Sequence, residues 1–317
     1  MDNYNASDLK PIGGGGNGTI FLTPKDTVIK AIKGQSNCYE AAKQKDKQNQ
    51  VVASIERLKS IPSDDSLIQL IKKYVTVSRA LSYSTNSFTI NGENYNCYFE
   101  MDRLYGIPLS VYREFDASVD DNIDKKYLAS VGNDFNVMVQ LMFSSENPAK
   151  IYNHDTSSPM SSTNPTRGYA ISKYDTRFLD FLRITRNLQI SDDEFKRVIG
   201  FIYGWLYYDA KIIAQDVEFT LGFDPTLLQF RINILDFDQI VDEPNVDSII
   251  PDIFDYDVYM DVDDKIFQDA WKFAKSMSDN LRQTNQSGQT GGRTGKYYKK
   301  YMKYKYKYDS LRNRKGY

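Results

Sequence analysis

The sequence predicts an α+β fold with two lobes, a small β-rich lobe followed by a mainly helical one. Strand-like alternation of apolar and polar residues dominates the first third of the chain, and helical periodicity dominates the rest. Two short strand-like segments interrupt the helical part, so the chain does not alternate regularly between strand and helix. At 317 residues, it is long enough for two lobes that each have a core.

The amino-terminal segment "PIGGGGNGTIFLTPKDTVIKAIK" (residues 11–33) combines a cluster of glycines with strand-like alternation. In "TVIKAIK", Val28, Lys30 and Ile32 fall on one face of the predicted strand. A polar helix is predicted next, at about residues 36–60. The segment "SFTINGENYNCYFEMDRL" follows it, and "NGEN" predicts the turn of a β-hairpin.

The second part of the chain begins at "LYGIPLSVY", where Gly106 and Pro108 interrupt the strand pattern. A helix is predicted over residues 124–143, then a polar loop insertion over 144–169. Ser191 and Glu194 form a capping-box pattern at the start of a strongly amphipathic helix. Two strand-like segments, residues 216–222 and 230–241, precede a final body helix in "KIFQDAWKFAKSMSDNL".

These patterns divide the chain into four parts. We expect an N-lobe at residues 1–105, with a glycine-rich loop and a helix, and a C-lobe at 106–282 that carries the insertion. Residues 283–295 are rich in Gly, Ser, Thr and Gln, a composition typical of a flexible linker. Residues 296–317 form a basic tail rich in Tyr and Lys.

Charge is distributed unevenly along the chain. Residues 293–317 contain ten Lys and Arg against one acid, whereas residues 1–292 contain 30 basic and 41 acidic residues. In the tail, Tyr297, Tyr301, Tyr304, Tyr308 and Leu311 repeat as the seam of a short helix does. Such a tail could order against a protein partner, nucleic acid, a membrane surface or the acidic body; the alternative is a loose solubilising tail.

The cysteine count and the absence of apolar spans set expectations about compartment. Cys38 and Cys97 are the chain's two cysteines, so we expect no disulfides and a reducing, intracellular and cytoplasmic setting. The first residues, "MDNYNASDLK", lack the apolar centre of a signal peptide. The longest apolar run, at residues 200–208, is too short for a transmembrane segment.

The glycines near the amino terminus could be a flexible linker or a phosphate-binding loop. A P-loop requires a lysine after the last glycine, but Thr19 stands there. A dinucleotide-binding loop requires a following helix, whereas a strand is predicted. A glycine-rich hairpin over nucleotide phosphates fits best, with Gly13, Gly15 and Gly18 in the pattern G-x-G-x-x-G and Ile20 at the apolar position beyond it.

Four segments together resemble a divergent protein-kinase-like domain. Lys30 in "VIK" resembles the kinase strand lysine, and "YFEMDRLYGIPL" resembles the connector between kinase lobes. "DVEFTLG" and "INILDFDQ" resemble the catalytic-loop strand and the D-F-G element. The resemblance is strongest to fungal kinase-like domains of unknown function that carry D-V-E-F-V-L-G followed by D-F-N. It covers about residues 12–241 and implies a two-lobed protein-kinase-like fold.

The resemblance also implies cofactors and site residues. It implies ATP and Mg²⁺, with phosphates near the glycines and Lys30, although Lys33 is a competing candidate. Adenine would rest near Ile20 and Val28, and its edge would face backbone groups of Glu100, Met101 and Asp102. The metal ligands would be Asp236 and Glu218. The acidic partner of Lys30 would be Glu40, with Glu56, Gln48 and Gln50 as alternatives.

The catalytic loop departs from the kinase pattern. If Glu218 takes the metal-binding position, Ile213 takes that of the catalytic base and Gln215 that of the loop lysine. Asp216 is the remaining candidate for an improvised base. The sequence therefore predicts a pseudokinase or an atypical phosphotransferase. His154, the only histidine, lies in the polar insertion and is expected to be a solvated loop residue.

The alternative function is a non-catalytic interaction or virion-assembly protein that docks through the kinase-like scaffold and the basic tail. The segment "YYKKYMKYKYKYDSL" resembles the terminal Tyr/Lys segments on proteins of giant DNA viruses. This resemblance implies a viral protein located in a virus factory or a virion.

Overall fold

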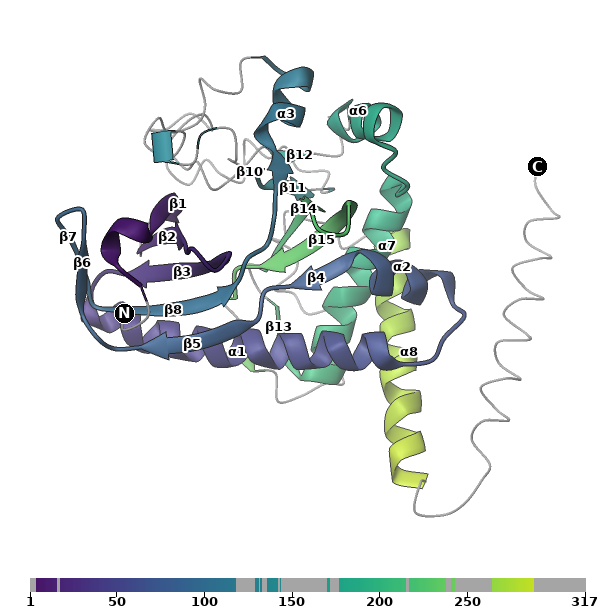
Figure 1. The fold of residues 1–317 in the computed structure, drawn as a ribbon. Coiled ribbons are helices and arrows are strands. Elements are labelled where there is room, and N and C mark those ends of the chain that lie inside the picture. Colours follow the sequence, from purple (N-terminus) through teal and green to yellow (C-terminus); the bar gives the residue numbers. More distant parts are fainter. Residues whose placement is uncertain are drawn as a thin grey trace, which may run out of the picture.

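The structure is a computed structural model of the chain, and it describes a defined subset of the residues. These are residues 4–15, 18–117, 129–130, 132, 136–141, 143, 170–171, 177–214, 217–237, 241–242 and 264–287. They form a mixed α+β arrangement with two five-stranded sheets, a β-rich amino-terminal region and several helices in the later part of the chain. Figure 1 shows the β-rich amino-terminal region beside the helices of the later part of the chain.

The first sheet forms from the amino-terminal strands in the order β1-β2-β3-β8-β5, and all of its neighbouring pairs are antiparallel. One face of the sheet packs on a core that includes Phe21, Ile29 and Tyr95, and the other packs on α1 (Gln35–Ser60) through a cluster that includes Ile32 and Phe99. The bounds are β1 (Lys10–Gly15), β2 (Gly18–Leu22), β3 (Thr27–Ile32), β5 (Ala80–Ser84) and β8 (Cys97–Asp102), with a short 3-10 turn η1 (Ala6–Asp8) ahead of them.

A separate hairpin confirms the turn predicted at "NGEN". It pairs β6 (Phe88–Ile90) with β7 (Glu93–Tyr95). Asn91 and Gly92 have φ values of 52° and 80°, as a tight two-residue hairpin turn requires.

Helix α1 (Gln35–Ser60) joins the two sheets, and its extent confirms the polar helix predicted at residues 36–60. Val51, Ile55 and Leu58 recur at helical spacing and are completely buried. The helix contacts β3, β5 and β8 of the first sheet and β4 of the second. Figure 1 shows it running along the first sheet and on toward the second.

The second sheet has the strand order β12-β11-β14-β15-β4. β14 and β15 form a long antiparallel hairpin, β11 pairs antiparallel with β14, and β4 pairs parallel with β15. Helix α2 (Ser66–Tyr74) and β4 (Val75–Val77) precede residue 105, yet they lie with this sheet and the core around α7. The other bounds are β11 (Val139–Leu141), β12 (Ala170–Ile171), β14 (Glu218–Asp224) and β15 (Gln229–Leu235).

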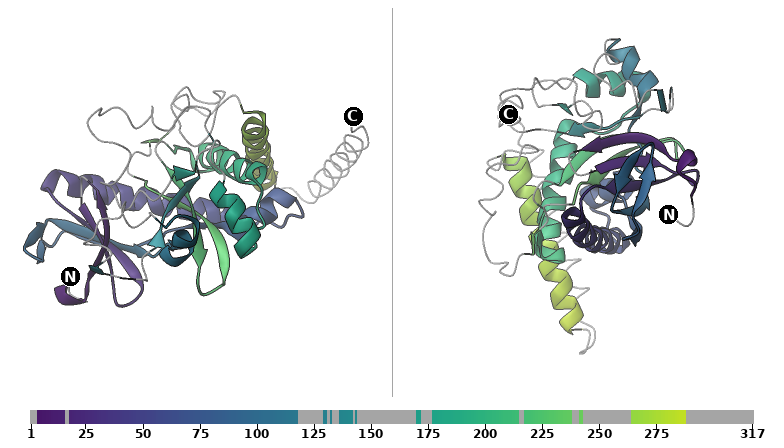
Figure 2. Two further views of the ribbon diagram at one scale, coloured as in Figure 1. Left: turned by 90° about the horizontal axis from the view of Figure 1, so that it is seen from above. Right: turned by 90° about the vertical axis from the view of Figure 1, so that its left-hand side faces the viewer.

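The remaining helices pack around the second sheet. The capping box predicted at Ser191 and Glu194 is confirmed at the start of α7. α7 packs against α8 (Figure 2). A Cβ atom on Gly204 would lie 3.0 Å from the carbonyl oxygen of Trp271, so glycine permits the close approach of the two helices. The bounds of the helices are α3 (Leu109–Phe115), α6 (Arg177–Arg186), α7 (Asp192–Trp205), the π-helical turn η4 (Leu206–Ala210) and α8 (Lys265–Ser287). Two small sheets complete this part: β9 (Ile107–Pro108) pairs with β10 (Asn136–Val137), and β13 (Ile212–Ile213) pairs with β16 (Val241–Asp242).

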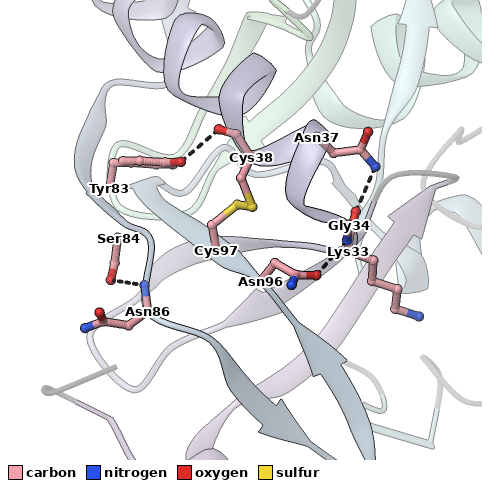
Figure 3. Close-up of a disulfide and its surroundings, with 9 residues drawn as sticks. All are labelled: Lys33, Gly34, Asn37, Cys38, Tyr83, Ser84, Asn86, Asn96 and Cys97. Carbon is pink, nitrogen blue, oxygen red and sulfur yellow. Dashed lines mark hydrogen bonds between the residues drawn. A yellow bond between two sulfur atoms is a disulfide. The ribbon is translucent and has the colours of Figure 1, made fainter.

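The expectation of no disulfides is wrong. Cys38 on α1 and Cys97 at the start of β8 form a disulfide, with Cα atoms 5.8 Å apart and a separation of 59 residues in the sequence (Figure 3). Both residues are buried, and Tyr83 donates a hydrogen bond of 2.8 Å to the carbonyl oxygen of Cys38. A cysteine count does not show which side chains meet, whereas the packing of α1 on the first sheet brings these two together.

The helix predicted at residues 124–143 is also wrong over its last part. Residues 136–137 and 139–141 are strands β10 and β11, and Val139, Gln140 and Leu141 are all buried. The run "VMVQL" is apolar except for Gln140, and a short, mostly apolar run does not distinguish a buried strand from a buried helix. Pairing with β14 decides in favour of the strand.

Other predictions fall on residues outside the described ranges. These are the insertion at 144–169 with His154, Asp216 and Gln215 of the catalytic loop, and the tail at 296–317. α8 ends at Ser287, so it extends into the linker predicted at 283–295. Among the residues that the structure describes, no helix is long and apolar enough to cross a membrane.

The start of α8 gives a pH-dependent prediction. The Asp264 carboxylate accepts hydrogen bonds from the backbone N–H of Ile266 (2.8 Å) and from Lys196 Nζ (2.8 Å). Burial opposes its ionisation, but these donors outweigh burial and lower the pKa of Asp264. The carboxylate therefore stabilises the fold above its unfolded-state pKa of about 4, and this contribution is lost as pH falls through the lower folded-state pKa.

We expect Asp264→Asn to lower the free energy of unfolding by about 1 kcal/mol at pH 7. The difference from wild type should vanish at a pH below the folded-state pKa. Urea unfolding of the variant and the wild-type protein, at pH 7 and at a pH below the folded-state pKa, measures this difference in the free energy of unfolding. Asp269→Asn is the matched control, because Asp269 forms an exposed ion pair with Lys265 on the same helix and should change stability little. An equal loss for Asp264→Asn at both pH values would contradict this account.

Candidate functional site

The glycine-rich segment is a hairpin of the first sheet. β1 and β2 pair antiparallel, with Gly13 opposite Ile20 and Gly15 opposite Gly18. A Cβ atom on Gly18 would lie 2.1 Å from the carbonyl oxygen of Ala31 on β3, so no other residue fits there without moving the strand. The structure thus makes this segment a strand pair rather than a linker; residues 16–17, between the two strands, lie outside the described ranges.

Lys30 lies in the middle of β3, opposite Ile20 on β2 and Phe99 on β8. Its Nζ atom donates a hydrogen bond of 3.2 Å to Oε1 of Gln44 on α1, and it lies 5.9 Å from the centroid of the Phe99 ring. Val28 is on the same strand face and is buried. The strand lysine is therefore paired with the helix, but its partner is a neutral amide.

The acidic partner predicted for Lys30 lies elsewhere. Glu40 forms a salt bridge with Lys43, and both side chains are more than half exposed. Glu56 likewise pairs with Lys59 on the outer side of α1. The structure therefore does not bring Glu40 to Lys30, and the residue that it does bring, Gln44, was missed.

One sequence signal could have identified Gln44. The buried stripe of α1 that contains Val51, Ile55 and Leu58 continues toward the helix start through Gln48 and Gln44 at the same spacing. Both glutamines are buried, and Gln48 donates a hydrogen bond of 2.7 Å to the carbonyl oxygen of Ser78. A polar residue on an otherwise apolar stripe indicates a buried partner.

The backbone of the connector segment is engaged in the first sheet. Glu100 and Met101 lie on β8 between β3 and β5, and a central strand uses its N–H and C=O groups in the two ladders. The Asp102 N–H donates to the Arg79 carbonyl oxygen (2.9 Å), and its own carbonyl accepts from Ser78 Oγ (2.6 Å). Groups that could meet a base edge must therefore come from residues that follow β8.

The residues after β8, from Arg103 to Gly106, lead from the first sheet to the second, and hydrogen bonds fix them to both sheets. Arg103 pairs with Asp26 in the β2–β3 turn at 2.5 Å, and the Tyr105 hydroxyl donates to the same carboxylate. Burial, reinforced by Asp26, raises the pKa of Tyr105 to about 12. The Tyr105 carbonyl then accepts a hydrogen bond of 2.9 Å from Asn233 on β15.

The β14–β15 register brings the two predicted metal-binding carboxylates to one end of the hairpin. Glu218 begins β14 and lies opposite Leu235, the last residue of β15, so Asp236 is the next residue beyond its cross-strand neighbour. Asp236 has φ of 60°, in the left-handed region that residues other than glycine rarely adopt. Such conformations cluster at functional sites, where the surrounding structure maintains them.

The segment predicted to be the catalytic loop connects β13 to β14. Ile213, at the position of the base, is in β13 and pairs with Val241 of β16, so its position is that of a strand residue. Asp216 lies outside the described residues, and its role stays a prediction. Within the described part of the chain, no group of three or more His, Cys, Asp or Glu residues is arranged to hold a metal ion.

Helix α1 connects the surroundings of Lys30 with the turn that leads to β13. Gln50 donates a hydrogen bond of 2.8 Å to the carbonyl oxygen of Ala210, and Ser54 Oγ donates one of 2.7 Å to Asp209 Oδ2. Trp205 donates from its indole N–H to the Ser54 carbonyl at 3.1 Å. The helix that contacts Lys30 is thus also anchored at η4, two residues before β13.

No family model and no curated protein matches the chain. Among the solved structures that match is the gentamicin-APH(2")-IIa complex, at 12% identity and a TM-score of 0.24, covering 87% of this chain and 82% of that chain. The streptomycin-ATP-APH(2")-IIa ternary complex also matches, at 12% identity and a TM-score of 0.24, covering 90% of this chain and 86% of that chain. Both likenesses are distant.

Proposed function

We propose that the chain is a kinase-like nucleotide-binding protein that holds ATP with Mg²⁺ and transfers phosphate poorly or not at all. The observation that supports the proposal is the β14–β15 register, in which Glu218 lies opposite Leu235 and Asp236 is the next residue along the chain. Two carboxylates from adjacent strand ends are a donor set suited to Mg²⁺, which usually binds one or two protein carboxylates together with nucleotide phosphates.

The amino-terminal hairpin supports the phosphate side of the proposal. Gly13, Gly15 and Gly18 lie on two paired strands, and the next strand carries Lys30, which resembles the kinase lysine that contacts the α- and β-phosphates. In this interpretation, Gln44 holds Lys30 in place without neutralising its charge, because an amide carbonyl accepts the hydrogen bond but carries no net charge.

The catalytic side of the proposal rests on residues that the kinase reaction needs. Phosphoryl transfer requires a group that orients and deprotonates the acceptor hydroxyl. Ile213 has no such group, and Gln44 replaces the acid that pairs with the lysine in active kinases. We infer that binding exceeds catalysis, with Asp216 as the candidate for any remaining base.

The proposal predicts that ATP with Mg²⁺ stabilises the wild-type protein. At nucleotide concentrations about 100-fold above Kd, the melting temperature should rise by roughly 5 °C. Lys30→Ala should lose most of this shift, because the cation that meets the phosphates is gone. Lys33→Ala is the matched control, since Lys33 is exposed and pairs with Glu93, and it should keep the shift. An unshifted wild-type melting curve would remove the nucleotide site.

A second measurement separates binding from catalysis. Release of ADP from ATP with Mg²⁺ should stay near background in the wild-type protein. Robust turnover that Asp216→Ala abolishes would instead show an active transferase with Asp216 as its base, and would contradict the inferred loss of catalysis.

A further inference from the structure

The second sheet contains a row of buried polar side chains that the proposed function does not use. Gln140 on β11 lies opposite Thr220 on β14, and Thr220 lies opposite Asn233 on β15. Their exposed fractions are 2%, 0% and 1%, so each occupies a core position. Burying an amide is unfavourable unless it is hydrogen-bonded, so the partners of these side chains indicate what they do.

The Gln140 amide points along the sheet to the start of β14. Glu218 is two residues before Thr220, so it is on the same face and is the diagonal cross-strand neighbour of Gln140. A long side chain spans this diagonal, and Gln140 Nε2 donates a hydrogen bond of 2.7 Å to Glu218 Oε1. The amide of Asn233 donates instead to a backbone carbonyl, that of Tyr105, at 2.9 Å.

We propose that Gln140 is a positioning residue that fixes the Glu218 carboxylate for a divalent cation. This inference rests on the proposed function, in which Glu218 and Asp236 hold the metal. A donor to one carboxylate oxygen fixes the rotation of the group, and partners of this kind orient metal ligands in many sites.

The neutral charge of the Gln140 amide matters for positioning Glu218 as a metal ligand. A lysine or arginine at position 140 would orient the carboxylate equally well but would neutralise it, and the cation would then be attracted less strongly. The neutral amide orients Glu218 and preserves the two negative charges that Glu218 and Asp236 present. Gln140 thereby complements Gln44, which holds Lys30 without cancelling its charge.

The test measures how strongly metal couples to nucleotide. Kd for ATP is determined by calorimetry in Mg²⁺ and in EDTA, and the ratio of the two values gives the metal effect. Gln140→Met removes the donor at similar size and should reduce the metal effect about tenfold or more, with Kd in EDTA unchanged. Asn233→Leu is the matched control, because it removes a buried amide from the same row without touching Glu218.

A double-mutant cycle identifies the route of the effect. In a Glu218→Gln background, Gln140→Met should change the metal effect no further, since the carboxylate through which it acts is absent. If Gln140→Met does not fold, Gln140→Asn retracts the amide by one methylene and should give the same loss while keeping the position polar.

The outcomes are distinguishable. A Gln140→Met protein with the wild-type metal effect, or an equal loss in Asn233→Leu, would overturn the positioning role and leave the proposed function intact. Wild-type protein that binds ATP in neither condition would overturn both.

Discussion

Reducing the Cys38–Cys97 disulfide is expected to lower the free energy of unfolding by about 2–4 kcal/mol. The bond closes a loop of 59 residues that contains all of α2, nearly all of α1 and the strands β4 to β7. An open loop of this length gives the unfolded chain many more conformations, so the folded state loses stability relative to it. Urea unfolding of the same protein with and without dithiothreitol measures the difference.

The double variant Cys38→Ala/Cys97→Ala is the control for this experiment. It should match the reduced wild-type protein, and dithiothreitol should not change its stability. Hydrogen exchange adds a local measurement, because reduction should raise the exchange of the first turns of α1 more than that of α7. Identical urea curves for oxidised and reduced wild-type protein would show that the bond does not constrain the fold.

Gly222→Ala is expected to destabilise the protein by about 3 kcal/mol or to prevent folding. A Cβ atom at this position on β14 would lie 1.9 Å from the Tyr105 carbonyl oxygen and 2.5 Å from Asn233 Nδ2. These two atoms are hydrogen-bonded to each other, and the Phe223 N–H binds the neighbouring Gly106 carbonyl at 3.2 Å. The methyl group would therefore push the connector off the second sheet, and the nearest obstacle is backbone.

Gly92→Ala is the control that separates the steric clash at Gly222 from the loss of stability caused by replacing a glycine in general. Gly92 has φ of 80°, but a Cβ atom there would have no other atom within 4 Å, so alanine meets backbone strain alone, about 1 kcal/mol. Chemical denaturation of the two variants compares them. A Gly222→Ala protein as stable as Gly92→Ala would mean that the connector does not press on β14.

Elements with strong local signals were predictable from the sequence. The Ser191–Glu194 capping box and the Asn91–Gly92 turn are confirmed. The two late strands are confirmed as β14 and β15, but the second ends at Leu235 instead of continuing to residue 241. Each depends on side chains only a few residues apart, so a short window of sequence contains the interactions that form it. The mixed α+β class, with its β-rich first part, follows from the same local patterns.

Parts of the candidate site depended on contacts between distant residues and were not predictable in this way. Glu40 and Gln44 are four residues apart, so helical spacing puts them on the same side of α1, one turn from each other. Only the packing of α1 on β3 shows that Gln44 meets Lys30, while Glu40 pairs with Lys43. The engagement of Glu100 and Met101 by two neighbouring strands likewise requires the strand order. Strand β11 was mistaken for helix because its pairing partner lies about 80 residues further along the chain.

The sequence alone indicated that a cluster of glycines precedes a strand with Lys30, and that two later strands carry acidic residues at their ends, but it left open whether the glycines form a linker or a hairpin. Only the tertiary structure decided that Cys38 meets Cys97 and that Gln44 meets Lys30. It alone also decided that Glu218 lies opposite Leu235, the residue before Asp236, and that Gln140 donates a hydrogen bond to the Glu218 carboxylate. The reason is physical. Backbone periodicity is a property of neighbouring residues, whereas a disulfide, a cross-strand register and a buried amide's partner depend on which surfaces the whole chain buries together.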